Sequence, residues 1–202
     1  MNILDLTGLS TEILSSLSYE SKLNISLRRN LHYFDKDALL NELFDYVDWL
    51  DELDIWENVA IDYRIKSRDS IILKYNRYYP DHQAGKVFND IVGFRGFCDK
   101  YDDVMQLDQE NLRIVDMSKG KANDDGYRGV HIYYQKDNKH YPIEIQFNTL
   151  YDRQLNNWLH DYVYKKNYSN IIGIKLRLSY ESGKIHNDTD FKEELNNVLL
   201  SC

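Results

Sequence analysis

The sequence has little proline, few cysteines and no long apolar run. Only 2 prolines and 9 glycines occur in 202 residues, and no internal repeat or low-complexity segment interrupts the chain. The two cysteines, Cys98 and Cys202, lie far apart and lack metal-ligand spacing, which favours a reduced, cytoplasmic protein. No stretch approaches the roughly 18 apolar residues of a membrane span, and the start, MNILDLTGLSTEIL, lacks the features of a signal peptide. We therefore expect no membrane partner.

Positive charge is also scarce. The chain has 25 Lys and Arg against 33 Asp and Glu, which gives a net charge of -8. This balance argues against a broad electrostatic footprint on nucleic acid, although a small local basic patch stays compatible with it. Apolar residues make up 43% and charged residues 29%, as in ordinary globular proteins, and the length suffices for one domain with a sizeable core.

Hydrophobic periodicity predicts an α/β or α+β protein with one mixed sheet. KDALLNELFDYVDWLDELDIW has apolar residues at helical spacing, so residues 1–60 are predicted to be a helical N-terminal extension. Strands then alternate with helices in a domain at 61–180, and a short helical tail follows at 181–202. The predicted strands are 60–67, 89–99, a segment ending near 115, 127–135, 140–148 and 174–183; the predicted helices are 68–79, one beginning at 101, 150–166 and 190–200.

The stretch RIKSRDSIILKYNR predicts a basic, hydroxyl-bearing stripe at the start of a helix. Two basic residues of an extended segment share a face, and the polar positions of the following helix fall within about 80° of arc. Such a stripe suits a polyphosphate, because cationic side chains and the N–H groups of a helix N-terminus both bind phosphate oxygens. A solvated helix face with ion pairs is the alternative. The stripe consists of Arg64, Lys66, Ser67, Ser70, Lys74 and Arg77.

Two carboxylates are expected on buried strands. Asp90 opens the apolar strand NDIVGFR, where a carboxylate is costly unless it is paired or bound to a cation. In PIEIQFNT, alternation places Glu144, Gln146 and Asn148 on one face and the apolar residues on the other. If Asp90 and Glu144 lie close together, they can hold one Mg²⁺, which prefers a few carboxylates with phosphate oxygens. The alternatives are a strand cap or an ion pair of Asp90 with Arg95, and a solvent face for the polar row.

The stretch DDGYRGVHIYY presents aromatic and basic residues after a turn. In an extended chain Tyr127, Gly129 and His131 share a face, and the glycine leaves room for a planar base on the tyrosine ring. His131 would then be a polar neighbour of that base. The alternative is an aromatic pair on a sheet face.

In this order the motifs resemble the synthetase domain of the RelA/SpoT family, from about Arg64 to Lys165. RIKSRDSIILKYNR resembles the family's donor-binding stretch, and NDIVGFRG its first acidic strand. DGYRGVH resembles the acceptor loop, PIEIQFNT the second acidic strand, and WLHDYVYKK the end of the next helix.

The resemblance implies a nucleotidyltransferase-like mixed sheet flanked by helices. It also implies transfer of the β,γ-pyrophosphate of ATP to the ribose 3′-hydroxyl of GDP or GTP, which makes an alarmone. The basic stripe would bind ATP, and Asp90 and Glu144 would be catalytic and hold Mg²⁺, with Glu144 also able to accept the 3′-hydroxyl proton. The implied acceptor-binding residues are Tyr127, Arg128, His131, Gln146 and Asn148, with support from Arg95, Lys121 and His160.

Departures from the family pattern gather on the acceptor side. Asn148 stands where many members have an arginine, Asp125 where they have an asparagine, and Gly129 where a serine is common. In the preceding loop, Lys119 or Lys121 would take the place of the family's lysine. A toxin-type relative, which pyrophosphorylates the tRNA 3′ CCA end or makes adenosine alarmones, is therefore the second hypothesis. An antitoxin partner and a homo-oligomer stay open, and no hydrolase activity is expected. The local patch that tRNA would need comprises Lys119, Lys121, Lys165, Lys166, Lys175 and Arg177.

A hypothesis of another class is a non-catalytic nucleotide sensor on the same fold. Loss of an acidic residue would favour it, and both Asp90 and Glu144 are present.

Overall fold

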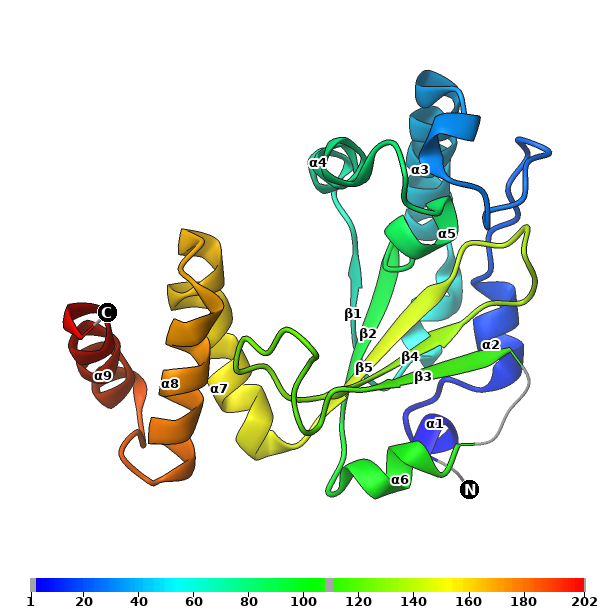
Figure 1. Ribbon diagram of the computed structural model, residues 1–202. Coiled ribbons are helices and arrows are strands. Elements are labelled where there is room, and N and C mark those ends of the chain that lie inside the picture. The colour runs from blue at the N-terminus through cyan, green and yellow to red at the C-terminus, as the bar shows by residue number, and fades with distance from the viewer. Residues whose placement is uncertain (1–2, 108–110, 202) are drawn as a thin grey trace. The chain divides into compact units, whose positions relative to one another are not determined.

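A computed structural model describes residues 3–107 and 111–201 of the chain (Figure 1). Its described residues form a five-stranded mixed sheet flanked by helices, which confirms the predicted fold class. Strand β1 (Asp62–Ile65) pairs antiparallel with β2 (Val92–Phe97), with Arg64 opposite Gly93. The strand order continues through β5 (Ile143–Asn148) and β4 (Val130–Tyr134) to β3 (Leu112–Asp116).

Helices precede, interrupt and follow the strands. The N-terminal residues contain α1 (Ile3–Leu6), α2 (Thr11–Ser16), the 3-10 turn η1 (Leu31–Tyr33), α3 (Lys36–Asp51) and the 3-10 turn η2 (Asp54–Asn58). Between strands lie α4 (Arg68–Tyr78), α5 (Ala84–Val87) and α6 (Tyr101–Met105). After β5 come α7 (Leu150–Tyr162), the 3-10 turn η3 (Tyr164–Lys166), α8 (Asn170–Glu181) and α9 (Asp188–Leu200). Across the described ranges, none of these helices is long and apolar enough to cross a membrane.

The chain divides into two compact units. The first unit contains residues 1–96, 106–114 and 131–146, and the second contains residues 97–105, 115–130 and 147–202. The divisions at residues 60 and 180 that the sequence suggests stay a prediction.

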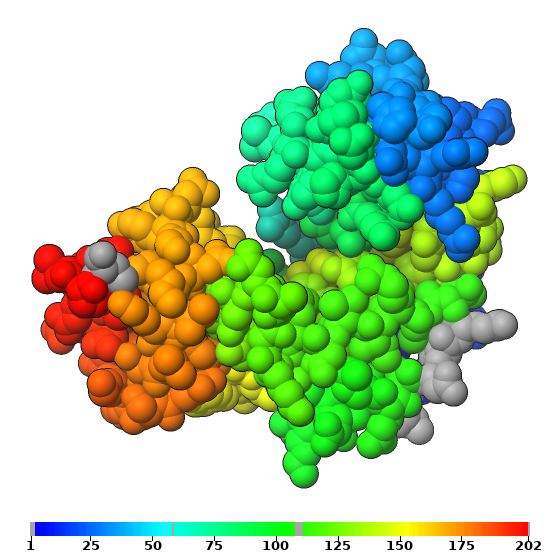
Figure 2. Space-filling view, in the orientation of Figure 1, coloured from blue at the N-terminus to red at the C-terminus, as the bar shows by residue number. Residues whose placement is uncertain are grey.

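In the first unit the N-terminal residues are fixed to the connection between β4 and β5. Tyr46 on α3 stacks on both Tyr19 and Tyr141, with ring centroids 4.7 and 5.7 Å away. The Tyr141 hydroxyl donates to Glu42 on α3 at 2.8 Å, and Glu20 forms an isolated bridge with His140. Figure 2 shows the N-terminal loop, in blue, against this yellow-green connection. The N-terminal helices therefore belong to the body of this unit.

In the second unit α7, α8 and α9 stand side by side around a shared apolar core (Figure 1). The predicted strand at 174–183 is wrong, because most of this segment lies in α8. The buried residues of α8 are Ile172, Gly173, Leu176 and Arg177, a spacing of three to four residues that only a helix brings to one face. The alternating apolar residues after position 173 mimic a strand over a shorter window.

Candidate active site

The turn from β1 into α4 builds the basic stripe. Ser67 is the N-cap of α4: its backbone is extended, and its side chain accepts a hydrogen bond from the N–H of Ser70 at 3.4 Å. Its hydroxyl also donates to Ser70 Oγ at 2.9 Å. A serine cap of this kind fixes where the helix begins and leaves the N-terminal N–H groups beside Lys66. The stripe therefore starts at a helix N-terminus, as the sequence predicts.

Asp90 lies between two ammonium groups. Lys66 Nζ is 2.5 Å from Asp90 Oδ2, and Lys74 Nζ, from the second turn of α4, is 2.8 Å from Oδ1. All three side chains are mostly shielded from solvent. Asp90 lies two residues before the first residue of β2, so it does not open the strand. Among the described residues, Asp90 forms ion pairs with Lys66 and Lys74 and none with Arg95.

Glu144 on β5 is held by three neighbours on the same face of the sheet. The Tyr133 hydroxyl donates to Glu144 Oε1 at 2.8 Å, and His131 Nδ1 lies 3.1 Å from the same oxygen. Gln146 Nε2 donates to Oε2 at 2.7 Å. Burial raises the pKa of Glu144, but the hydrogen bonds and the charge that His131 carries when protonated outweigh it and lower the pKa to about 2. Glu144 is therefore an anion across the physiological range.

A small cavity of about 70 Å³ is lined by both carboxylates and by basic residues. Gly93 and Phe94 of β2 complete its wall. Ser67, Ser70, Lys74 and Arg77 are not part of the lining, although Lys74 reaches Asp90. The predicted site residues that line the cavity are Arg64, Lys66, Asp90, Arg95, Glu144 and Gln146.

The donor set of this cavity fits a magnesium ion. Mg²⁺ is usually bound through one or two carboxylates while substrate phosphates and water complete its shell. Asp90 and Glu144 supply two such groups on one cavity, and each carboxylate oxygen accepts further ligands beyond its present partners. Within residues 3–107 and 111–201 there is no cluster of three or more His, Cys, Asp or Glu side chains that would suit an all-protein metal site.

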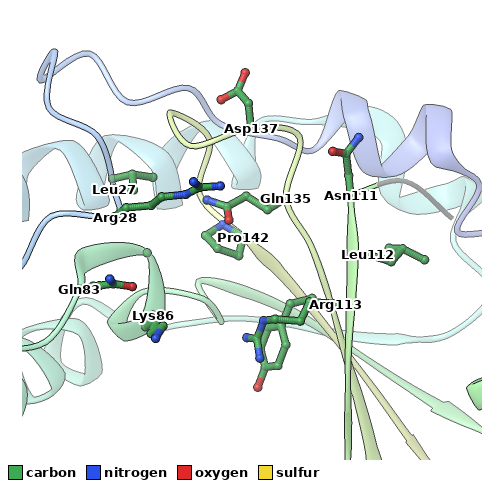
Figure 3. Close-up of a pocket in the computed structure, with 12 residues that line it drawn as sticks. Leu27, Arg28, Gln83, Lys86, Asn111, Leu112, Arg113, Gln135, Asp137 and Pro142 are labelled. Carbon is green, nitrogen blue, oxygen red and sulfur yellow. The ribbon is translucent and has the colours of Figure 1, made fainter. Parts of the chain in front are cut away.

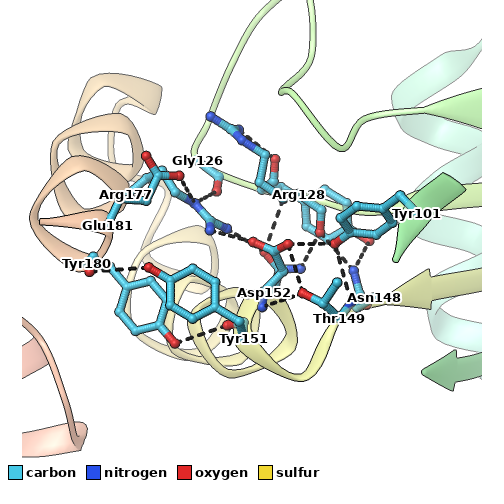
Figure 4. Close-up of polar contacts among 12 residues, drawn as sticks. Tyr101, Gly126, Arg128, Asn148, Thr149, Tyr151, Asp152, Arg177, Tyr180 and Glu181 are labelled. Atoms are coloured by element: carbon cyan, nitrogen blue, oxygen red, sulfur yellow. Dashed lines mark hydrogen bonds and ion pairs between the residues drawn. The ribbon is translucent and has the colours of Figure 1, made fainter. Parts of the chain in front are cut away.

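The loop that carries Tyr127 lies in the second unit, and Asn148 of β5 contacts its backbone at Arg128 (Figure 4). Asn148 Nδ2 donates to the Arg128 carbonyl at 2.8 Å and to the Tyr127 hydroxyl at 3.4 Å. A Cβ on Gly129 would lie 2.5 Å from Asn148 Nδ2 and 2.7 Å from the Tyr127 hydroxyl, so the glycine lets the ring lie against the backbone. Lys121 places its ammonium 4.9 Å from the Tyr127 ring centroid.

Arg128 serves the loop itself in this structure. Its guanidinium donates to Asp124 from Nη1 and Nη2, at 2.8 and 3.0 Å, and to the carbonyl of Tyr127 at 2.8 Å. A role for Arg128 in acceptor binding stays a prediction. His160 is exposed on α7 beside Asp161, and its supporting role also stays a prediction.

A buried network in the second unit was missed by the sequence reasoning. Arg177 on α8 is 1% exposed and donates to Asp152 at 2.6 Å and to the carbonyl of Gly126 at 2.9 Å. Asn156 on α7 bonds both the N–H and the carbonyl of Arg128, at 3.2 and 2.7 Å. The placement of Arg177 in a surface basic patch for tRNA is therefore wrong. The sequence signal for this network is an arginine at a position that faces the core if residues 170–181 form a helix. The prediction of a strand for this segment placed Arg177 on a different face.

The family model described as "Region found in RelA / SpoT proteins" matches residues 63–169, more than half of the chain. The chain belongs to the RelA/SpoT family. The matched residues include the basic stripe, both carboxylates and the Tyr127 loop, whereas α8 with Arg177 lies beyond them.

Solved structures that the chain is similar to include small alarmone synthetases. Synthetase 1 from Bacillus subtilis, bound to its product pppGpp, is 21% identical with a TM-score of 0.44, over 81% of this chain and 90% of that chain. Synthetase 2 from Bacillus subtilis is 23% identical with a TM-score of 0.46, over 80% and 98%. A GTP pyrophosphokinase family protein from Streptococcus pneumoniae is 20% identical with a TM-score of 0.45, over 80% and 91%. No curated protein matches the chain.

Proposed function

We propose that this RelA/SpoT protein is a pyrophosphokinase that transfers the β,γ-pyrophosphate of ATP to the ribose 3′-hydroxyl of GDP or GTP. One observation carries the proposal. A single cavity is lined by Arg64, Lys66 and Arg95 together with Asp90 and Glu144, all within the family region. Attack on the β-phosphorus needs positioning and neutralisation of charge more than covalent help, and this set of residues supplies both.

The two lysines on Asp90 would bind the triphosphate. Lys66 and Lys74 each place an ammonium on this carboxylate, and phosphate oxygens would compete for the same groups. The N-terminus of α4, which begins at the Ser67 cap, adds N–H groups that favour an anion. When bound on Asp90 and Glu144, Mg²⁺ would neutralise charge on the phosphate oxygens.

Glu144 would act mainly through its negative charge. A carboxyl group with a pKa of about 2 is a weak proton acceptor at neutral pH, since the best general bases have a pKa near the working pH. Its lowered pKa instead favours cation binding and orientation of the 3′-hydroxyl. His131 and Tyr133 keep Glu144 in this state by their contacts with Oε1.

Tyr127 would stack on the acceptor base. Its loop is fixed by Asn148 and Asn156 through the backbone of Arg128, so the ring is presented on an ordered support. Base stacking on an aromatic ring is sequence-tolerant, so Tyr127 itself does not select guanine.

A toxin-type activity on the tRNA 3′ end is the second candidate, and one observation favours it. Asn148 stands where many family members have an arginine, and its amide is bonded to the loop backbone. The guanidinium group of Arg128 is already hydrogen-bonded to the Asp124 carboxylate. The loop therefore offers few cations to the 5′-polyphosphate of GDP or GTP, which a terminal adenosine of tRNA does not carry. An antitoxin would accompany this activity.

The test offers the purified protein γ-labelled ATP and Mg²⁺, with GDP, GTP, AMP, ADP or deacylated tRNA as acceptor. Label on GDP or GTP would support the proposed synthetase, and label on tRNA or an adenine nucleotide would replace it with the second candidate. If ATP binds and no acceptor is labelled, the proposal fails in favour of a nucleotide sensor.

A further inference from the structure

A second cavity, of about 400 Å³, opens in the first unit on the side of β3 and β4 (Figure 3). Its volume lies in the range of about 300–1,000 Å³ that is typical of small-molecule pockets. The walls come from the N-terminal loop at Leu27, from α5, from β3 and β4, and from the connection after β4. It shares no lining residue with the cavity of Asp90 and Glu144, so it is a separate site.

Three cations from separate segments surround this cavity. Arg28 comes from the N-terminal loop, Lys86 from α5 and Arg113 from β3, as Figure 3 shows. In the part of the chain that the structure describes, none of the three forms an ion pair. Asp137, the carboxylate among the described lining residues, is already paired with His140 Nδ1 at 2.8 Å. A cationic cavity in a chain of net charge -8 concentrates anions.

Arg113 lies over an aromatic ring of the cavity wall. Its guanidinium carbon lies 4.3 Å from the centroid of the Tyr133 ring. A guanidinium group binds phosphate through forked N–H contacts, so Arg113 supplies a suitable group for an anion with several oxygens. The amide side chains of Gln83 and Asn111 also line the cavity and add neutral hydrogen-bonding groups.

Tyr133 lines the second cavity and also contacts Glu144, which lines the first. Its ring lines this second cavity and contacts Arg113, while its hydroxyl donates to Glu144 Oε1 at 2.8 Å. A ligand that draws Arg113 off the ring changes the surroundings of the phenol, and thereby the hydrogen bond on Glu144. One side chain therefore joins an anion-attracting cavity to the candidate catalytic carboxylate.

We propose that this cavity binds a small molecule that carries a phosphate or pyrophosphate group, and that the bound group acts on Glu144 through Arg113 and Tyr133. The binding stands on the cavity and its cations alone. The action on Glu144 rests on the proposed function, because it needs Glu144 to be catalytic.

Calorimetric titration with inorganic pyrophosphate tests the binding. The Lys86→Gln/Arg113→Gln variant removes two cations of the second cavity, and Lys66→Gln/Lys74→Gln removes the two lysines on Asp90. We expect two binding events in the wild-type protein and one in each double variant. A charge-matched control, Lys100→Gln/Lys184→Gln, changes exposed lysines that line neither cavity and should keep both events.

Two outcomes would overturn the binding proposal. One is an unchanged titration of the Lys86→Gln/Arg113→Gln variant, and the other is a single event in the wild-type protein that Lys66→Gln/Lys74→Gln abolishes. Circular dichroism of each variant shows that it is folded. GDP in place of pyrophosphate shows whether the phosphate group of a nucleotide is also accepted.

The transfer assay tests the action on Glu144. At saturating ATP and constant free Mg²⁺, added pyrophosphate competes at the ATP site equally in wild type and in Lys86→Gln/Arg113→Gln. The account predicts an additional rate change of at least about threefold, roughly 0.7 kcal/mol, in the wild-type protein alone. Tyr133→Phe should keep the second binding event and lose the additional rate change. Equal rate changes in the wild type and in Lys86→Gln/Arg113→Gln would overturn the proposed action on Glu144. A wild-type protein without transfer activity would refute the proposed function, while the result of the binding titration would still stand.

Discussion

Arg177 Nε donates a hydrogen bond of 2.9 Å to the carbonyl oxygen of Gly126, the residue directly before Tyr127. The same guanidinium binds Asp152 at 2.6 Å, and its side chain is 1% exposed. A helix beyond the matched family region therefore holds the loop that carries the candidate stacking residue. Arg177 is a positioning residue in this account, because it reaches the acceptor only through the loop.

Replacing Arg177 by methionine should weaken both the fold and acceptor use. Asp152 would lose its cationic partner and keep the hydroxyl groups of Tyr101 and Thr149. Breaking a buried ion pair in this way costs about 3–5 kcal/mol. We expect the KM for the acceptor to rise while the KM for ATP changes little, because the loop loses its support and the ATP cavity lies in the other unit. Urea unfolding and steady-state kinetics measure the two effects.

Two further variants separate these effects. Arg177→Lys keeps a charge for Asp152 but lacks the fork that also reaches Gly126, so it should regain stability more than acceptor affinity. Lys184→Met, at an exposed position after α8, is the matched control. An Arg177→Met protein that folds and keeps its wild-type acceptor KM would contradict the positioning role.

Gly173→Ala should destabilise the protein although it improves helix propensity. In the interior of an ordinary exposed helix this change stabilises by about 1 kcal/mol. Here a Cβ on Gly173 would overlap the carbonyl oxygen of Asp125, so the loop must move away from α8. We expect a lower free energy of unfolding and a raised acceptor KM. A more stable Gly173→Ala protein would show that the close approach of α8 and the loop is absent in solution.

Tyr127→Ala should impair acceptor use far more than ATP use. Stacking of a base on an aromatic ring contributes about 1–3 kcal/mol, which corresponds to roughly a 5- to 150-fold loss in acceptor affinity. Tyr127→Phe is the matched control, because it keeps the ring and removes the hydroxyl that Asn148 contacts at 3.4 Å. Equal losses in the KM values for ATP and acceptor would remove the stacking role.

The lowered pKa of Glu144 predicts a dependence of stability on pH. Its pKa is about 2 in the folded protein against an ordinary value of 4.5, so ionised Glu144 stabilises the fold above the ordinary value. That contribution, about 3 kcal/mol at most, is lost as the pH falls from the ordinary pKa toward the folded one. The difference in unfolding free energy between wild type and Glu144→Gln should shrink over this range. A difference that stays constant between about pH 6 and about pH 3 would contradict the assigned contacts.

Local patterns predicted much of the ATP side. The start of α4 follows from Ser67, whose side chain caps the helix, and the polar face of β5 follows from the alternation that includes Glu144. These features depend on neighbours a few residues away in the chain. Resemblance to the family then grouped Arg64, Asp90 and Glu144, and these three residues line one cavity.

Contacts between distant residues escaped the sequence reasoning. The choice of Lys66 and Lys74 as partners of Asp90, in place of Arg95, depends on how α4 packs beside the start of β2. Tyr133 looked like one of many strand tyrosines, and its role depends on the pairing of β4 with β5. Arg177 was misplaced because a short window of alternating residues outweighed the longer helical period.

The measurement that tests the central claim most directly compares the wild-type protein with Asp90→Asn in the transfer assay with γ-labelled ATP and GDP. The account predicts labelled guanosine 3′-pyrophosphate product from the wild type and a loss of at least about a thousandfold in Asp90→Asn. An amide binds Mg²⁺ far more weakly than a carboxylate, so the variant would lose the cation that neutralises charge on the phosphates. Asp81→Asn, which removes an exposed carboxylate outside the cavity, should transfer at the wild-type rate. Full transfer by a folded Asp90→Asn protein would show that the cavity of Asp90 and Glu144 is not where the reaction occurs.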